Sequence, residues 1–135
     1  MAKASKQRTV VWTAEPAAHD YPAAESYLRL VAGPDLARVC SALLSQAPTV
    51  QQHAKDILRA ARLPLLPADD AEVVEDLKKV AKGIALSPVL VVRGDVTTGR
   101  PAQIADGYHR VCASYHLDET TDVPCRLISL PAISV

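Results

Sequence analysis

The sequence has no phenylalanine, and aromatic residues make up only 4% of its 135 residues. A core of ordinary size for one domain must therefore be built mainly from leucine, valine, isoleucine and alanine. Acidic and basic residues balance at 15 each, so the formal net charge is zero. Because sequence-independent DNA binding relies on a broad positive field, a neutral chain is not expected to bind DNA in that way.

Long apolar runs and an even set of cysteines are also missing. No stretch approaches the roughly 20 apolar residues that a membrane-spanning helix needs, and the opening MAKASKQRTVVW has too short an apolar run for a signal peptide. The three cysteines are widely spaced, at Cys40, Cys112 and Cys125. Their number and spacing predict neither a disulfide framework nor a zinc site, and they favour a reducing, cytoplasmic location. No membrane partner is expected, because no apolar run is long enough to span a bilayer.

The first half of the chain carries the apolar spacing of amphipathic helices. A loose tail at residues 1–8 and a short strand at 9–13 are expected before them. Four helices are predicted, over about 20–32, 35–47, 50–61 and 69–82. Their starts are assigned to Asp20 with Pro22, to Asp35, to a capping box of Thr49 and Gln52, and to Asp69 with Glu72.

The second half changes character. The β-branched run at 88–92 predicts a buried strand, and 102–105 can return as the second strand of a hairpin. A helix is expected over 108–115 and a last strand over 123–130. The sequence thus predicts a single-domain α+β protein, with a helical half at 9–67 and a small mixed sheet in 68–135.

The stretch IADGYHRVCASYHL contains the candidate site, because five successive residues, Asp106 to Arg110, precede a helical pattern. His109 and Arg110 lie in the first helical turn, where a cation is unfavourable by roughly 0.3–1 kcal/mol. A bound anion would explain both cations, since the free N–H groups of a helix N-terminus also attract negative charge. Gly107 would let a phosphate approach the backbone closely.

A purely structural interpretation of the same residues is equally open. Asp106 can be an N-cap, Arg110 can pair with it, and Gly107 can serve only the turn. Arg93, directly after the first strand of the hairpin, could reach the anion site or simply decorate the turn.

Other chemistry-bearing residues have ordinary explanations. His116 lies near the end of its helix, where the dipole favours a cation, and Cys112 lies on the apolar stripe as a small buried hydrophobe. The basic residues within 53–62 are expected to form a solvated helix face.

From Leu86 to Leu130, the segments LSPVLVVRG, IADGYHRVCASYHLDE and VPCRLI resemble the ParB/sulfiredoxin-like superfamily, over about a third of the chain. The resemblance implies a small mixed sheet with a helix after the DGYHR turn, and nucleotide phosphates bound at that turn. By position, Gly107, His109 and Arg110 would hold phosphate with Tyr108 beside them, and Asp106 would act on an acceptor hydroxyl or a metal. Because Tyr108 stands where sulfiredoxins have their reactive cysteine, sulfinic acid reduction is not implied.

The resemblance leads to a first hypothesis of a nucleotide- or phosphate-binding enzyme, a phosphotransferase or ATPase that uses ATP with Mg²⁺. A second hypothesis is a non-enzymatic binding module that senses a nucleotide or holds a partner. A third is DNA binding or nuclease activity, although the helix-turn-helix domain that follows in full ParB proteins is not seen before Val135. A homodimer is open, because the helices around 36–44 and 50–61 could pack internally or across an interface.

Overall fold

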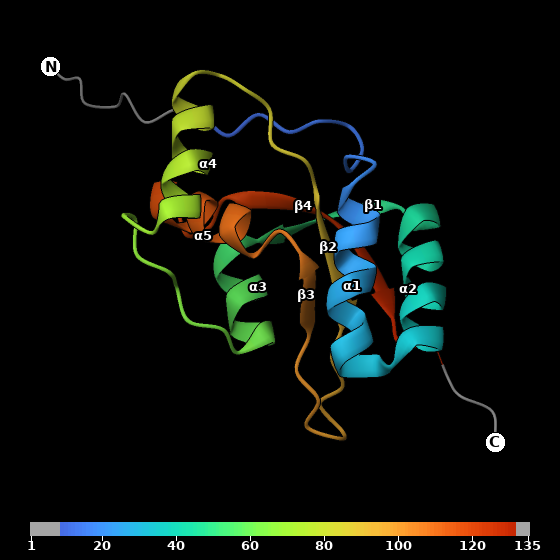
Figure 1. The fold of residues 1–135 in the computed structure, drawn as a ribbon. Helices are drawn as coiled ribbons and strands as arrows, with labels where there is room; N and C mark the ends of the chain where they lie inside the picture. The colour runs from blue at the N-terminus through green and yellow to red at the C-terminus, as the bar shows by residue number, and fades with distance from the viewer. Residues whose placement is uncertain (1–8, 132–135) are drawn as a thin grey trace, which may run out of the picture.

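The computed structural model describes residues 9–131, so the tail expected at 1–8 lies outside the described residues. The helices in this part are α1 (Asp20–Ala32), α2 (Pro34–Gln46), α3 (Ala54–Ala61), α4 (Ala71–Ala81) and α5 (Tyr108–Leu117). The strands are β1 (Thr49–His53), β2 (Val89–Arg93), β3 (Gln103–Asp106) and β4 (Asp122–Ser129). Helices and a mixed sheet in one chain confirm the predicted α+β class (Figure 1).

The four strands form one sheet in the order β1-β4-β2-β3. β2 and β3 pair antiparallel as the predicted hairpin, and the chain then passes through α5 to reach β4, which pairs parallel with β2. β1 pairs antiparallel with the other edge of β4. The two predicted halves therefore share one sheet, since β1 comes from residues 49–53, which were expected to begin a helix.

The strand residues alternate between two apolar layers, as the twofold period of a strand requires. Val89 and Val91 belong to a buried cluster with α3, α4 and α5. Leu90 and Val92 belong to a second cluster with α1 and α2. The sheet thus lies between two groups of helices, which Figure 1 shows on either side of it.

The prediction for residues 49–53 was wrong: they form β1 and not the first turn of a helix. Thr49 pairs with Arg126, whose Nε also donates to Thr49 Oγ1 at 3.0 Å across 77 positions of sequence. The helix then begins at Ala54, whose N–H donates to Thr121 O at 3.0 Å. A capping box is a local signal, and here pairing with a distant strand satisfies the same backbone groups instead.

Two smaller expectations also need correction. The strand expected at 9–13 is only an isolated bridge between Trp12 and Leu86. Asp35 does not cap α2, because the helix already begins at Pro34 and Gly33 occupies the N-cap position. On α2, Val39 and Leu43 are exposed at 45% and 39% because only a narrow strip of that helix faces the sheet.

The N-cap of α4 is Asp70 rather than Asp69: its carboxylate accepts hydrogen bonds from the N–H groups of Glu72 and Val73 at 3.1 and 3.2 Å. Asp70→Ala is therefore expected to lower the free energy of unfolding by about 1 kcal/mol, because two helix-terminal donors lose their acceptor. Asp69→Ala is the matched control and should change it by less than about 0.5 kcal/mol. Urea denaturation of the two variants measures the difference, and equal losses would contradict the assignment.

Candidate functional site

The site residues gather where β3 passes into α5. Gly107 is the N-cap residue of α5, with φ at 110°, and no side chain in the described part of the chain caps this helix. A Cβ on Gly107 would lie 2.4 Å from Val89 Cγ1. The glycine is thus required by the turn and by packing against β2, whatever binds at the helix N-terminus.

Asp106 does not cap the helix either, because its carboxylate turns to Arg110. Arg110 Nη2 donates to Asp106 Oδ2 at 2.9 Å and to the Pro88 carbonyl at 3.4 Å. The same Nη2 lies 3.8 Å from Asp20 Oδ2. The Arg110 side chain is only 17% exposed, and its buried Nε has no hydrogen-bond partner among the residues that the structure describes.

Asp20 is the residue of this cluster that sequence reasoning missed, since it was assigned only to the start of α1. It is 2% exposed, and its Oδ2 accepts from Ser87 Oγ at 2.8 Å and from the Ala17 N–H at 3.0 Å. His19 Nε2 lies 3.4 Å from the other carboxylate oxygen. No local pattern could have found this contact, because Ser87 lies 67 positions further along the chain.

The carboxylates of the site are perturbed by burial. Burial raises the pKa of Asp106, the Arg110 guanidinium opposes that rise, and the nearby Asp20 carboxylate adds to it. Burial likewise raises the pKa of Asp76 on α4, against the opposing charges of Lys79 and Arg110. Two half-buried acids with raised pKa values beside a cationic helix start are typical of functional clusters.

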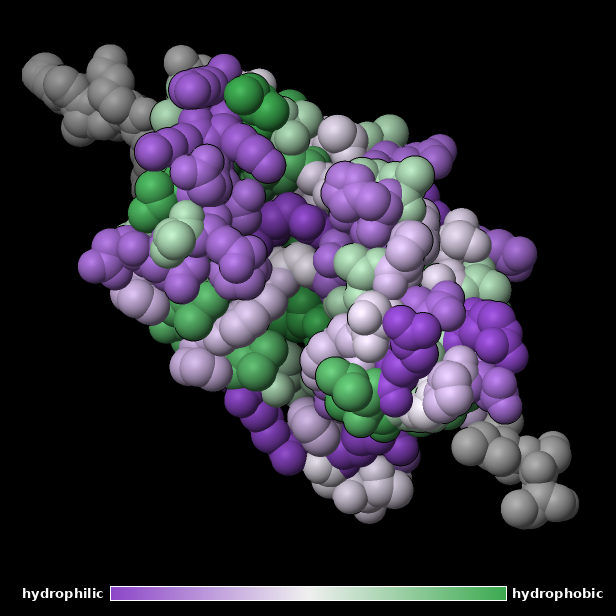
Figure 2. All heavy atoms as spheres, in the orientation of Figure 1, coloured by the Kyte–Doolittle hydropathy of each residue, from purple (hydrophilic) through white to green (hydrophobic). Residues whose placement is uncertain are grey.

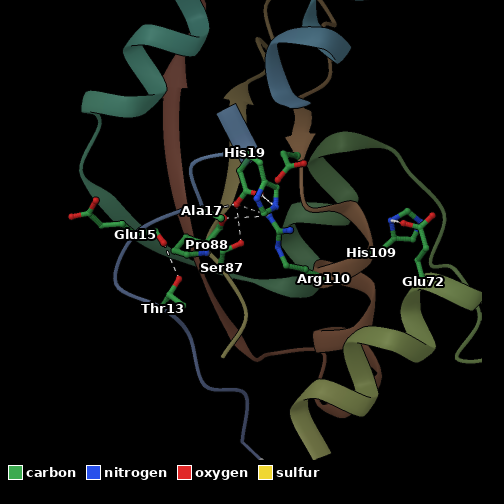
Figure 3. Close-up of polar contacts among 11 residues, drawn as sticks. Thr13, Glu15, Ala17, His19, Glu72, Ser87, Pro88, His109 and Arg110 are labelled. Atoms are coloured by element: carbon green, nitrogen blue, oxygen red, sulfur yellow. Dashed lines mark hydrogen bonds and ion pairs between the residues drawn. The ribbon is translucent and has the colours of Figure 1, made fainter. Parts of the chain in front are cut away.

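The other predicted site residues point elsewhere. His109 turns to α4, where its Nδ1 lies 3.4 Å from Glu72 Oε1, while the Tyr108 hydroxyl donates to Pro64 O at 2.6 Å. Figure 3 shows that Arg110 and His109 point in different directions, Arg110 toward Ser87 and Pro88 and His109 toward Glu72. The two side chains therefore turn to different partners, whereas the sequence interpretation expected both to face one anion.

Arg93 does not reach the turn. It ends β2, three residues beyond Leu90, which pairs with Asp106, and its Nη1 donates to Ser129 Oγ at 2.8 Å. Arg93 therefore lies at the far end of β2, where it pairs with Ser129, and it does not border the candidate site.

Two hollows meet at Arg110. One has a volume of about 380 Å³ and lies between α4 and the start of α5, and the other, of about 310 Å³, lies beside Ser87 and His19. Asp76, Lys79 and Arg110 border both. Figure 2 shows hydrophilic side chains over α4 and a hollowed surface beside them.

The 380 Å³ hollow, which we call the α4–α5 hollow, mixes both signs of charge. Its cationic or titratable nitrogen groups are Lys79, His109 and Arg110. Its carboxylates are Glu72, Glu75, Asp76 and Asp106. The hollow contains more carboxylates than cationic side chains. Binding of an anion there is therefore favoured when a cationic side chain leaves a carboxylate for the anion, or when a carboxylate becomes protonated.

The remaining candidates of the sequence have structural explanations. Cys112 is buried as predicted, and burial raises the pKa of the Cys125 thiol to about 12, so neither is a reactive thiolate. His116 Nε2 lies 2.7 Å from Leu66 O. Within residues 9–131 we find no cluster of three or more histidine, cysteine, aspartate or glutamate residues that could hold a metal ion, and no helix long and apolar enough to cross a membrane.

Comparison with known proteins found no match: no protein-family model, no curated protein and no solved structure is similar to this chain. Function must therefore be inferred from the residues of the site itself.

Proposed function

We propose that the chain is a nucleotide- or phosphate-binding protein whose anion site is the α4–α5 hollow. The observation that supports this most strongly is the start of α5, a helix N-terminus without a side-chain cap in the described chain, which shares one hollow with Lys79, His109 and Arg110. Free backbone N–H groups and the helix dipole attract an anion, and Lys79 and Arg110 supply full charges beside them. The resemblance of this turn to the ParB/sulfiredoxin-like superfamily agrees with the proposal.

The same site can support phosphoryl transfer from a nucleotide such as ATP. The terminal phosphoryl group would move to the hydroxyl oxygen of an acceptor, with loss of the bond to the diphosphate leaving group. Asp106 would take the proton that the acceptor hydroxyl releases, a role for which a raised pKa is favourable. Lys79 and Arg110 would offset the negative charge on the transferred group.

Mg²⁺ that accompanies ATP is usually held by one or two carboxylates together with the phosphates of the nucleotide. The described residues contain no group of three or more histidine, cysteine, aspartate or glutamate side chains that could hold a metal ion, and Asp106 is already engaged by Arg110 at 2.9 Å. We therefore assign Asp106 to the acceptor, and we assign no residue of this site to Mg²⁺.

A non-enzymatic binding module is the second candidate. The observation in its favour is the closed ion pair between Arg110 and Asp106, because an arginine held by a carboxylate is poorly prepared to stabilise a transition state. Such a module would bind the nucleotide as a signal in the same hollow without turning it over.

The test uses two neighbouring lysines of α4. Lys79 borders the hollow, whereas Lys78 lies 3.8 Å from Glu75 in an exposed pair. We expect Lys79→Ala to weaken binding of ATP, ADP, CTP or inorganic phosphate about five- to tenfold, and Lys78→Ala to leave binding within about twofold. Calorimetric and thermal-shift titrations of the full chain, with and without Mg²⁺, measure both.

The outcomes separate the candidates. Turnover by the native chain that is lost in Asp106→Asn while binding remains indicates an enzyme. Binding without turnover indicates the module. Failure of the native chain to bind any of the four ligands would falsify the proposal and leave the DGYHR turn as a structural element.

A further inference from the structure

We propose that Asp20 is a positioning residue of this site: when an anion draws Arg110 out of its ion pair, Asp20 and Asp106 hold one proton between them, so anion binding is accompanied by proton uptake. This inference rests on the proposed function and adds to it a residue and a mode of regulation. Asp20 comes from α1, in the part of the chain for which the sequence suggested no relative.

The geometry places two carboxylates on one guanidinium. Arg110 Nη2 lies 2.9 Å from Asp106 Oδ2 and 3.8 Å from Asp20 Oδ2; the Asp106 side chain is partly buried, with 19% exposed, and the Asp20 side chain is buried, with 3% exposed. One guanidinium can neutralise only one carboxylate, so the trio carries a net negative charge when all three groups are ionised. A buried surplus charge of this kind favours binding of a proton.

Arg110 is the part of the trio that can move. It borders both hollows, and its buried Nε has no partner in the described chain, so its present position leaves one donor unsatisfied. Asp20 is held in place by Ser87 and by the Ala17 N–H, independently of Arg110. Asp106 is held by the pairing of β3 with β2 at Leu90.

An anion at the start of α5 would compete with Asp106, at 2.9 Å, and with Asp20, at 3.8 Å, for the Arg110 guanidinium. Once the guanidinium turns to the anion, the two carboxylates that shared its Nη2 atom remain without their cation and cannot both stay ionised. The pair then takes up one proton, which the two carboxylates share. This is the role that Asp20 would play beyond holding Arg110.

The other titratable groups around the pair do not remove this requirement. His19 lies beside Asp20 but is 86% exposed on the surface. On the α4 side the hollow presents Lys79 together with Glu72, Glu75, Asp76 and His109. Lys79 is outnumbered there by carboxylates, so it cannot replace Arg110 as the cation of the pair.

The test is a calorimetric titration of sulfate into the full chain at a series of pH values. Sulfate is the probe because its own charge stays constant over the range in which phosphate titrates. Repeating each titration in two buffers of different ionisation enthalpy gives the number of protons taken up. We expect uptake to approach one proton in the native protein, with affinity falling by up to about tenfold per pH unit as the pH rises.

Asp20→Asn is the informative variant, because an asparagine of the same size can still accept from Ser87 and from the Ala17 N–H. It should lose the proton uptake and flatten the pH dependence of sulfate affinity. Asp35→Asn, which removes an exposed carboxylate paired with Arg38 on α2, should behave as the native protein does. A role of Asp20 in stability alone would lower the melting temperature and leave the proton count unchanged.

Each outcome decides a specific point. Sulfate binding without proton uptake in the native protein, or equal uptake in Asp20→Asn, overturns this inference and leaves the proposed function standing. Absence of sulfate binding at every pH counts against the proposed function as well. If circular dichroism shows that Asp20→Asn does not fold, Asp106→Asn carries the same test, since it removes the other carboxylate of the pair.

Discussion

Replacement of Arg110 by methionine is expected to lower the free energy of unfolding by about 3–5 kcal/mol, because it leaves one buried and one partly buried carboxylate without their cation. Those carboxylates are Asp106, at 2.9 Å from Arg110 Nη2, and Asp20, at 3.8 Å. Methionine preserves much of the apolar stem, so the loss reports the charge rather than a cavity. Urea denaturation at neutral pH measures it.

The loss should depend on pH with a definite sign. Burial raises the pKa of Asp106 in the folded protein, and removal of the guanidinium, which opposes this rise, would raise that pKa further. A carboxyl group whose pKa is higher in the folded than in the unfolded state stabilises the fold when protonated. The variant should therefore be closest to the native protein at acid pH and lose stability as the pH rises through the folded pKa of Asp106.

Two further variants test the cause. Adding Asp106→Asn to Arg110→Met should recover part of the lost stability, because one of the two uncompensated charges is then gone. Arg38→Met, which breaks an exposed pair with Asp35 at 2.9 Å, should cost less than about 1 kcal/mol. A loss for Arg110→Met as small as that for Arg38→Met would show that the buried cluster is not ionised as described.

Gly107→Ala is expected to lower the free energy of unfolding by about 2–4 kcal/mol, since the new methyl group meets β2 in a strained backbone conformation. The added Cβ would lie 2.4 Å from Val89 Cγ1 and 2.8 Å from Val89 Cβ, at a backbone φ of 110°. Thermal and urea denaturation measure the change.

Gly99→Ala provides the matched control. Gly99 also has a positive φ, at 77°, but apart from Gly99 and its two chain neighbours no residue of the described chain has an atom within 4 Å of the position that a Cβ would take there. Gly99→Ala should therefore lower the free energy of unfolding by only about 1 kcal/mol, from backbone strain alone. Equal losses at the two positions would contradict the packing explanation, whereas partial recovery of Gly107→Ala by Val89→Ala would support it.

Much of the fold could be predicted from the sequence because the signals are local. Gly33 separates α1 from α2, which begins at Pro34, and the β-branched run before Gly94 corresponds to β2. The return of the chain in β3 and the helical spacing after Gly107 were also visible. In each case a breaker, a cap or an apolar period within a few residues decides the backbone conformation.

The site was predicted only in part. The DGYHR stretch indicated the right turn, and the interpretation in which Arg110 pairs with Asp106 agrees with the 2.9 Å contact. His109 and Arg110 both border the α4–α5 hollow but turn to different partners, because His109 lies 3.4 Å from Glu72 on α4 and 3.9 Å from Asp70, the N-cap residue of that helix. The direction of each side chain depends on which element packs beside it, and no local pattern encodes that neighbour.

By itself, then, the sequence determined the α+β class, most helix and strand positions and the turn at which chemistry is expected. Only the tertiary structure decided that 49–53 is a strand, since its partner β4 lies far along the chain. Packing of α1 against β3 likewise placed Asp20 beside Arg110 and Asp106. The physical reason is the same in both cases: strand pairing and burial of charge are long-range interactions, whose energies outweigh local preferences of a fraction of a kcal/mol to about 1 kcal/mol per residue.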